Sequence, residues 1–367
     1  MVSFAQAMTE HRIAILPGDG TGREVAQEAV RLLETISEHS KHGFELTQID
    51  CGGQHFKEVG VEWAEGSFDF CKNDADAIFL GAIGHPGSYL PNGDLAGGSV
   101  ILGLRSGLDL YANVRPAKNR LGKSTKFPMG IDCIVMRENT EGFYSDRNMY
   151  QGVGELMPTK DCAISIRNIT RKGSTRIAEI GFKYAQERRK KLVAIHKANV
   201  LRFSDGLFLE CAREVSKKYP DVEYKEQIVD SMSALIIRDP SVFDVILATN
   251  LFGDNLSDAA SEIAGGLGLA ESINAGDNYC IAQAQHGSAP DIAGKNISNP
   301  VSLVGSTAML LDWLGKKNNE EKLKKVSMMI ENAIDKTVIN KETRTQDIGG
   351  KLSTTEFTKK LIENLDS

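Results

Sequence analysis

Short apolar runs alternate with longer amphipathic segments along most of the chain. The apolar runs predict buried strands over residues 12–16, 75–81, 133–136, 192–195 and 243–248. The amphipathic segments repeat apolar residues every three or four positions and predict helices over residues 22–38, 174–189, 207–219, 301–314 and 320–336. Such alternation is typical of proteins whose helices cover a sheet, so we predict an α/β fold.

Two segments interrupt this alternation. Residues 81–98 are rich in Gly and Pro and predict a long, mobile loop on one side of a cleft. Residues 152–158 predict a second, projecting segment. The chain has no low-complexity stretch and no clear internal repeat.

Composition narrows the class of protein. The 367 residues are 41% hydrophobic and 25% charged, which is ordinary for a globular enzyme of one large or two medium domains. A net charge of -6 argues against nucleic acid as a partner, and no apolar run is long enough to span a membrane. The six cysteines are scattered, and no secretion signal is evident. We therefore expect reduced thiols, no zinc site and a cytoplasmic location.

The segment 250–258 follows the last predicted strand and opens a helix-like pattern. Asp254 and Asp258 are four residues apart and would lie on one face of that helix. Two bare carboxylates so close repel each other, and Mg²⁺ or Mn²⁺ would remove that repulsion. Taken alone, the pair fits an ordinary solvated helix start better, because Asp is favoured near helix N-termini.

Three arginines and two other polar residues are further candidates. Arginine binds carboxylates through a planar fork, so three arginines beside a metal would suit a substrate with two carboxylates. The three stand near predicted strand or turn ends and are Arg105, Arg115 and Arg137. Tyr144, which follows a turn, and Lys197, which follows a predicted strand, are candidates for proton transfer. Singly, such residues are more often surface ion pairs, structural tyrosines or exposed lysines.

Two Gly-rich segments raise the question of a nucleotide. The turn at residues 16–22 lacks the third glycine of a dinucleotide-binding fingerprint, because Arg23 stands there, so a Rossmann fold is not supported. The segment 286–294 would let a nucleotide approach its backbone closely, and Asp291 would accept hydrogen bonds from ribose hydroxyls. The alternative is an ordinary loop. A hydrolase triad built on His286 is not supported, because the chain has no Gly-x-Ser-x-Gly elbow.

In combination, these segments resemble the β-decarboxylating dehydrogenases, which act on isopropylmalate, isocitrate, homoisocitrate, D-malate or tartrate. The resemblance runs from Arg12 to about Phe357. Its motifs are Leu-Pro-Gly-Asp-Gly at 16–20, Leu-Arg at 104–105, Asn-Val-Arg-Pro at 113–116, Arg-Glu-Asn-Thr-Glu-Gly at 137–142, Lys-Ala-Asn at 197–199, Asn-Leu-Phe-Gly-Asp at 250–254 and His-Gly-Ser-Ala-Pro-Asp at 286–291. Chance agreement of all of them in this order is negligible.

The resemblance implies an isopropylmalate/isocitrate dehydrogenase-like fold of two α/β domains with a central cleft, distinct from a Rossmann fold. Residues 1–109 and 266–367 would form a large, discontinuous cofactor-binding domain, and residues 110–265 a smaller domain with the metal and catalytic residues. It also implies a homodimer with shared sites, whose arm would fall near residues 149–167. In such a dimer Lys197 and Asp230 would reach into the partner's cleft.

The resemblance also implies roles for the candidates. Asp254 and Asp258, with the partner's Asp230, would hold Mg²⁺ or Mn²⁺. Lys197 would assist deprotonation of the substrate hydroxyl, and Tyr144 would protonate the enol that remains after CO₂ departs. The carboxylates of a small di- or tricarboxylate substrate would be held by Arg105, Arg115 and Arg137. The cofactor-binding residues that it implies are His286, Gly287, Ser288, Ala289, Asp291, Ile292 and Asn299.

Cofactor and substrate preferences can be partly predicted from departures within the family. NADP-using isocitrate relatives carry Lys and Tyr where this chain has Asp291 and Ile292, and an aspartate repels a 2′-phosphate, so we expect NAD. The variable substrate group would face Ser99, Ile101 and Leu102. This apolar pair is similar to the Leu-Leu pair of isopropylmalate enzymes, which D-malate and tartrate enzymes share. We expect 3-isopropylmalate (leucine biosynthesis) first, D-malate or tartrate second, and isocitrate or homoisocitrate third.

Two other classes of protein compete with this interpretation. A metal-dependent phosphoryl-transfer or hydrolytic protein would also use Asp254 and Asp258, but the chain lacks a Walker lysine motif. A non-catalytic subunit of the same family would have lost catalytic residues, whereas Tyr144 and Lys197 are both present. One further departure is Gln283, which stands where the family usually has a glutamate before the cofactor histidine.

Overall fold

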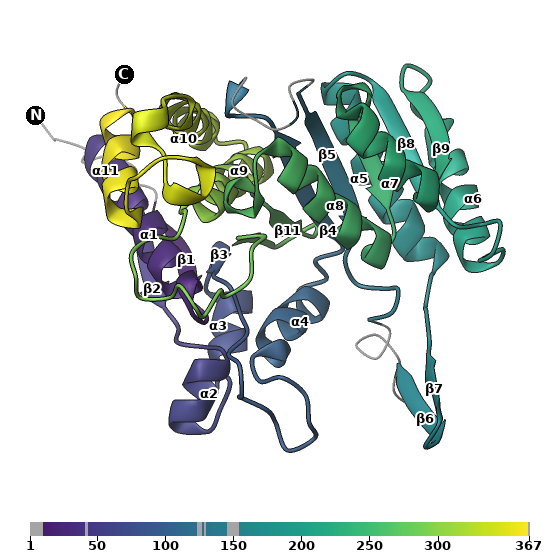
Figure 1. Cartoon of the computed structure of the whole chain (residues 1–367), viewed down its shortest axis with the longest axis horizontal. Helices are drawn as coiled ribbons and strands as arrows, with labels where there is room; N and C mark the ends of the chain where they lie inside the picture. The colour runs from purple at the N-terminus through teal and green to yellow at the C-terminus, as the bar shows by residue number, and fades with distance from the viewer. Residues whose placement is uncertain (1–9, 41–42, 123–126, 128–129, 145–153, 366–367) are drawn as a thin grey trace, which may run out of the picture. The chain divides into compact units, whose positions relative to one another are not determined.

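The computed structural model describes residues 10–40, 43–122, 127, 130–144 and 154–365 (Figure 1). The chain divides into two compact units: Met1–Ile101 with Tyr279–Ser367 form unit 1, and Leu102–Asn278 form unit 2. Helix α4 (Gly98–Gly107) contains the point where the chain passes from unit 1 to unit 2. Strands and helices alternate in both units, which confirms the predicted α/β class.

Unit 1 is built on a parallel sheet. Its strands, in spatial order, are β2 (Gly43–Gln48), β1 (Glu10–Leu16), β3 (Ala77–Leu80) and β12 (Cys280–Gln283). Its helices are α1 (Thr21–Ser40), α2 (Gly53–Val59), α3 (Ser67–Asn73), α9 (Val301–Asn318), α10 (Glu321–Ile339) and α11 (Thr354–Glu363). The apolar face of α1 is buried through Val25, Ala26 and Ala29, which pack with Ala284 and Leu303. The apolar side of the first predicted helix therefore faces the core.

Unit 2 contains a mixed sheet. Its strands, in spatial order, are β11 (Ile273–Ala275), β4 (Ala112–Lys118), β5 (Asp132–Glu138), β10 (Val245–Ala248), β8 (Lys191–His196) and β9 (Glu223–Ile228). The pairs β11–β4 and β4–β5 are antiparallel, and the pairs from β5 to β9 are parallel. The helices are α5 (Arg171–Glu187), α6 (Ser204–Ser216), α7 (Val229–Arg238) and α8 (Asn250–Ala264).

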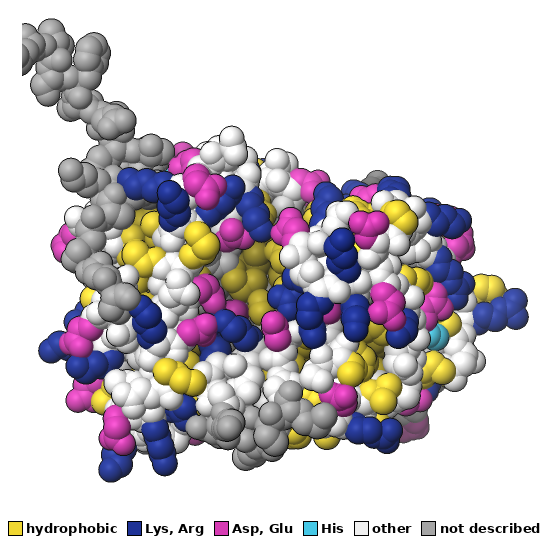
Figure 2. Space-filling model, turned by 90° about the horizontal axis from the view of Figure 1, so that it is seen from above, with side chains coloured by type: hydrophobic (Ala, Val, Ile, Leu, Met, Phe, Trp, Pro, Cys, Tyr) yellow, Lys and Arg dark blue, Asp and Glu magenta, His cyan; other side chains and the backbone are white. Residues whose placement is uncertain are grey.

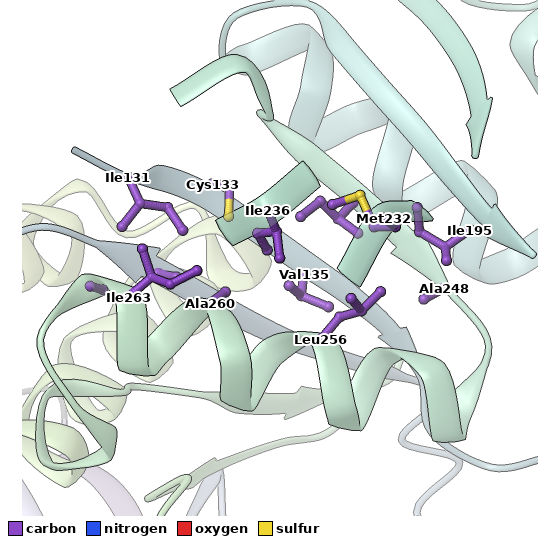
Figure 3. Packing of buried hydrophobic residues seen from close by; sticks show 13 residues of the cluster. Ile131, Cys133, Val135, Ile195, Met232, Ile236, Ala248, Leu256, Ala260 and Ile263 are labelled. Carbon is purple, nitrogen blue, oxygen red and sulfur yellow. The ribbon is translucent and has the colours of Figure 1, made fainter. Parts of the chain in front are cut away.

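The two faces of the unit 2 sheet are covered by different helices. Side chains alternate across a strand, so β10 presents Ile246 to one face and Leu247 to the other. Ile246 belongs to a buried cluster with Met232 of α7 and Leu256 of α8. Figure 3 shows Met232 and Leu256 in this cluster. On the opposite face, a Cβ at Gly181 of α5 would lie 3.3 Å from Leu247 Cδ1, so this glycine lets α5 pack closely.

A two-stranded antiparallel sheet projects from unit 2 (Figure 1). It consists of β6 (Glu155–Thr159) and β7 (Cys162–Ser165), and every residue of both strands is exposed. The predicted arm at residues 149–167 includes this hairpin, whereas residues 149–153 lie outside the described part of the chain. Met157 is 67% exposed and Ile164 46%, which is high for apolar side chains.

The surface agrees with the mixed charge of the sequence. On the face shown in Figure 2, Lys and Arg side chains are interspersed with Asp and Glu. Among the described helices, none is both long and apolar enough to cross a membrane.

Candidate active site

Strand parity places two of the predicted arginines on the face of the sheet that α8 covers. Ala117 of β4 and Val135 of β5 belong to the core beneath α8, and residues two positions away point to the same face. These are Arg115 and Arg137, only 7% and 2% exposed. Gly253 of α8 meets Arg137, where a Cβ would lie 2.8 Å from the arginine Cβ, so a side chain at 253 would displace it.

The buried arginines converge on the aspartates of α8. Arg115 Nη1 lies 2.9 Å from Asp254 Oδ1 and 3.5 Å from Asp258 Oδ1. Arg137 Nη1 also donates to Asp254 Oδ1. The aspartate side chains are 32% and 55% exposed, whereas the guanidinium groups are buried beneath them. The carboxylates are therefore open to a ligand and the arginines hold them from below.

Three uncharged residues orient the arginines. Asn113 Oδ1 accepts from Arg115 Nε at 2.5 Å, and Ser257 Oγ accepts from Arg115 Nη1 at 2.8 Å. Asn250 Oδ1 accepts from Arg137 Nη2 at 2.7 Å and from Nε at 3.1 Å. Sequence reasoning gave these three residues no role, although Asn113 and Asn250 stand inside the recognised motifs.

Positive charge is crowded at this site. Burial, followed by repulsion from Arg137 and Arg115, lowers the pKa of Arg105 to about 9, while Asp254 and Tyr144 act in the opposite direction. Burial and Arg137 likewise lower the pKa of Arg115 to about 10. Guanidinium groups remain protonated at neutral pH. A ligand with negative charge would therefore be attracted to this group of cations.

Lys197 and Asp230 form a separate pair. Lys197 follows β8, and its Nζ donates to Asp230 Oδ2 in the first turn of α7. Within the described part of the chain, no three His, Cys, Asp or Glu side chains gather as a metal-binding group. Asp230 therefore does not complete a site with Asp254 and Asp258 inside one chain.

A buried ion pair holds the turn that carries Lys197. Asp205, at 0% exposure, accepts the Lys197 backbone N–H at 2.6 Å and Arg167 Nη1 at 2.5 Å. Arg167 Nη2 also donates to Thr249 Oγ1 at 3.0 Å, at the residue before α8. The beginning of α8 and the Lys197 turn are thus fixed by one network. Sequence reasoning missed Asp205 and Arg167, because neither stands in a motif with a known spacing.

Two buried glutamates shape the turn that precedes Tyr144. Glu138 accepts the backbone N–H groups of Thr140 and Glu141, each at 2.8 Å. Glu141 accepts the Thr170 backbone N–H, also at 2.8 Å. Burial raises the pKa of Glu138 to about 7 and raises that of Glu141 as well. The described chain brings Tyr144 to the end of this turn, half-buried and close to Arg105.

In unit 1, the predicted cofactor segment is fastened to the turn between β1 and α1. Ser288 O accepts the Thr21 backbone N–H at 2.8 Å, and Ser288 Oγ donates to Gly84 O at 2.5 Å. Gly20 has φ +55°, and a Cβ there would lie 2.1 Å from Ser288 O. The Gly-rich turn therefore serves close backbone contact with this loop.

The far part of the loop is also anchored. Glu24 of α1 accepts the Gly294 backbone N–H and, at 3.1 Å, Ser298 Oγ. Asn299 Nδ2 donates to Asp347 Oδ2 at 3.0 Å. Asn299 was predicted to bind cofactor, whereas Glu24 and Asp347 were not singled out.

The other predicted cofactor residues leave polar groups open. His286 Nε2 is buried and has no hydrogen-bond partner among the described residues, and burial lowers the pKa of this imidazole. A Cβ at Gly287 would meet no described atom within 4 Å. Ala289 has φ +36°, Asp291 is exposed and Ile292 is half-buried. An orphaned buried nitrogen beside open backbone fits a polar ligand such as a nucleotide.

The predicted specificity residues lie in the first turns of α4. Ile101 and Leu102 are half-buried, and Ser99 is exposed. Gln283 is the last residue of β12, and its carbonyl accepts Ser306 Oγ at 3.1 Å.

A cavity of about 460 Å³ lies elsewhere in unit 2, against β8 and β9. Its wall includes Leu192, Leu235 and Phe243, and none of the predicted site residues lines it. The cluster of charged groups therefore does not lie in this cavity. It is open to solvent through its aspartates.

Comparisons with known proteins identify the family of the chain. Residues 12–362 match the family described as isocitrate/isopropylmalate dehydrogenase. The chain is 41% identical to a homoisocitrate dehydrogenase of Methanocaldococcus jannaschii, over 94% of each chain. It is 36% identical to a 3-isopropylmalate dehydrogenase of Sulfurisphaera tokodaii, over 96% of this chain and 98% of that one. The crystal structure of isocitrate dehydrogenase from Methylococcus capsulatus matches with a TM-score of 0.84 at 34% identity, over 97% of this chain and 100% of that one.

Proposed function

The chain belongs to the isocitrate/isopropylmalate dehydrogenase family of oxidative-decarboxylating hydroxyacid dehydrogenases, and we propose that it catalyses the NAD- and divalent-metal-dependent oxidative decarboxylation of 3-isopropylmalate. The observation that carries this proposal is the crowding of three arginines beside two open carboxylates. Such a site favours a ligand with at least two negative charges and room for a cation.

The arginines supply the binding of the substrate. A guanidinium fork makes two hydrogen bonds with one carboxylate, and each charge-assisted bond is stronger than a neutral one. Arg115 and Arg137 are already fixed by Asn113 and Asn250, so little side-chain freedom is lost when substrate binds. We assign the two malate carboxylates to the group formed by Arg105, Arg115 and Arg137.

The metal would be held by Asp254 and Asp258. Their oxygen atoms are partly exposed and lie one helical turn apart, which suits a hard divalent cation such as Mg²⁺ or Mn²⁺. When bound, the cation would make the substrate hydroxyl more acidic and polarise the ketone that forms. The buried Arg115 and Arg137 hold the Asp254 carboxylate in place from below.

A homodimer would complete this site. Within one chain Asp230 is paired with Lys197 and does not join Asp254. We propose that the partner's Lys197 and the partner's Asp230 enter each cleft, with the β6–β7 hairpin as the arm between the chains. A folded monomer would then lack the proton acceptor and one metal ligand.

Proton transfers belong to two residues in this scheme. The partner's Lys197 would take the proton of the substrate hydroxyl, and NAD, when bound, would supply the hydride acceptor. The substrate then loses CO₂, and Tyr144 protonates the carbon that carried the lost carboxylate. The position of Tyr144, close to one of the arginines that would hold the substrate carboxylates, favours this role.

The loop from His286 to Asn299 would bind NAD. Its backbone lies against the Gly-rich turn, and His286 Nε2 is available for a hydrogen bond. Asp291 is exposed, where its carboxylate would accept from ribose hydroxyls and repel a 2′-phosphate.

Substrate choice rests on α4. Half-buried Ile101 and Leu102 present apolar surface, which favours the isopropyl group over a carboxylate. D-malate or tartrate is the second candidate, because a small substituent would also fit beside this pair. The proposal places the protein in leucine biosynthesis, in the cytoplasm.

The test is NADH formation with Mn²⁺ or Mg²⁺ and each of five acids: 3-isopropylmalate, D-malate, tartrate, isocitrate and homoisocitrate. The expected result is the highest kcat/KM with 3-isopropylmalate, and a higher kcat/KM with NAD than with NADP. Preference for another acid of the panel would keep the mechanism and overturn the substrate. Absence of NADH formation with all five would contradict the proposed function.

A further inference from the structure

A glutamate from a neighbouring segment contacts the predicted specificity residue Ser99. Ser99 Oγ donates to Glu62 Oε2 at 2.5 Å. Glu62 Oε1 accepts the backbone N–H of Gly97 at 2.5 Å and of Ser99 at 3.3 Å. The carboxylate of Glu62 thus takes up the donors offered by the Ser99 hydroxyl and by the first turn of α4.

The segment that carries Glu62 is itself tied down. Glu62 O accepts the Gly52 backbone N–H at 2.9 Å, and Trp63 forms an isolated antiparallel β-bridge with Cys51. Glu62 is half-buried, whereas Glu65, three residues later, is exposed. The contact between Glu62 and Ser99 therefore joins two anchored pieces of backbone and not two free side chains.

Helix α4 relates Ser99 to the residues that would hold the substrate. Val100 and Leu104 are fully buried, which fixes the face that α4 turns to the core. Ser99 and Leu102 are three residues apart and share another face. Ser99 and Ile101 are predicted to face the variable group of the substrate, so that group would lie close to the Glu62 carboxylate that contacts Ser99.

We propose that Glu62 is a specificity-determining residue that excludes substrates with a third carboxylate, such as isocitrate and homoisocitrate. This inference rests on the proposed function, and it goes beyond the apolar pair by naming a repulsive element. A third carboxylate would meet a like charge and would find the hydroxyl and backbone donors already occupied. An isopropyl group or a hydrogen needs none of these donors. The chain would then differ in substrate from the homoisocitrate dehydrogenase to which it is 41% identical.

The test is the substitution Glu62→Gln. The amide keeps an oxygen that accepts from Gly97, loses the charge and adds an N–H donor toward a carboxylate. Glu65→Gln is the matched control, because it removes the same charge three residues away at an exposed position. Glu62→Asp retains the charge and checks that charge, not the loss of a side chain, is responsible.

The quantity measured is the kcat/KM for isocitrate divided by that for the best two-carboxylate acid of the panel. It should rise at least about tenfold in Glu62→Gln and change less than about threefold in Glu65→Gln and Glu62→Asp. If isocitrate is not turned over, its Ki as a competitive inhibitor replaces kcat/KM and should fall by a similar factor. An unchanged ratio and Ki, or a wild-type preference for a tricarboxylate, would overturn the inference while leaving the dehydrogenase activity established. A wild-type enzyme that oxidises none of the acids contradicts the proposed function, and the inference falls with it.

Discussion

The charged cluster of unit 2 and the loop at residues 286–299 of unit 1 are built in opposite ways. The cluster consists of side chains on regular elements, with Arg137 on β5 and Asp254 on α8 held at fixed positions by strand parity and helix spacing. The loop exposes backbone and one orphaned imidazole. It is anchored because Ser288 O accepts the Thr21 backbone N–H and Glu24 accepts the Gly294 backbone N–H. A site of buried charges is rigid and costly to build, which suits chemistry, whereas an anchored loop suits recognition of a large ligand.

The largest effect should come from the residue to which we assign the first proton transfer. Lys197→Met removes the amine, so kcat should fall by about 10² to 10⁴, the usual contribution of a general base. The Kd for NAD, measured by fluorescence titration, should be unchanged, because the loop in unit 1 is untouched. Lys217→Met, at an exposed position, is the control. A kcat within threefold of wild type would remove Lys197 from the mechanism.

A substitution in the arginine group should separate the two regions. Arg137→Lys keeps the charge but loses the fork that contacts both Asn250 and Asp254. Loss of one or two charge-assisted bonds should lower kcat/KM for the hydroxy acid by about 10- to 100-fold. The KM for NAD should change less than about threefold. Arg213→Lys, in an exposed pair with Glu226, is the matched control. An equally large effect on the hydroxy acid and on NAD would mean that the two regions are not independent.

The cost of buried charge predicts a pH dependence of stability. Because the pKa of Glu138 is raised from 4.5 to about 7, the folded state binds its proton more tightly than the unfolded state does. This contribution is therefore largest at low pH and is lost as pH rises from about 4.5 to 7. Between pH 5.5 and 8.0 the loss of this stability amounts to about 2 kcal/mol. The free energy of unfolding, measured in urea, should differ less between the two pH values for Glu138→Gln than for wild type. An equal difference in both proteins would contradict a raised pKa of Glu138.

The smallest of these effects concerns the loop. Asp291→Ser removes the exposed carboxylate that we assign to ribose recognition. The kcat/KM for NAD should fall by about tenfold, and the ratio of kcat/KM for NADP to that for NAD should rise. The KM for the hydroxy acid should stay the same. An unaltered NADP-to-NAD ratio would show that Asp291 does not discriminate the cofactors.

Much of the fold could be predicted from the sequence because the central strands are continuous apolar runs. β1, β3, β5, β8 and β10 all fall on predicted strands. The edge strands β2 and β9 were missed, and so were the interior strands β4, β11 and β12. β9 reads Glu-Tyr-Lys-Glu-Gln-Ile and is only partly buried, so its polar residues hide the strand signal.

The candidate site was predictable where chemistry demands a residue type and a spacing. Asp254 and Asp258 follow from helix periodicity, and their contact with Arg115 is shown by the structure. The contacts of Asp205 and Glu62 could not be foreseen. Each joins segments far apart in the chain, 38 residues for Asp205 with Arg167 and 37 for Glu62 with Ser99, and no local pattern encodes such pairings.

The most direct test of the central claim is the stoichiometry of the reaction. NADH and CO₂ should be measured together during oxidation of 3-isopropylmalate in the presence of Mn²⁺, with and without a chelator. The account predicts one CO₂ for each NADH and the loss of both when the metal is removed. NADH without CO₂, or turnover that persists in the chelator, would contradict a metal-dependent oxidative decarboxylase.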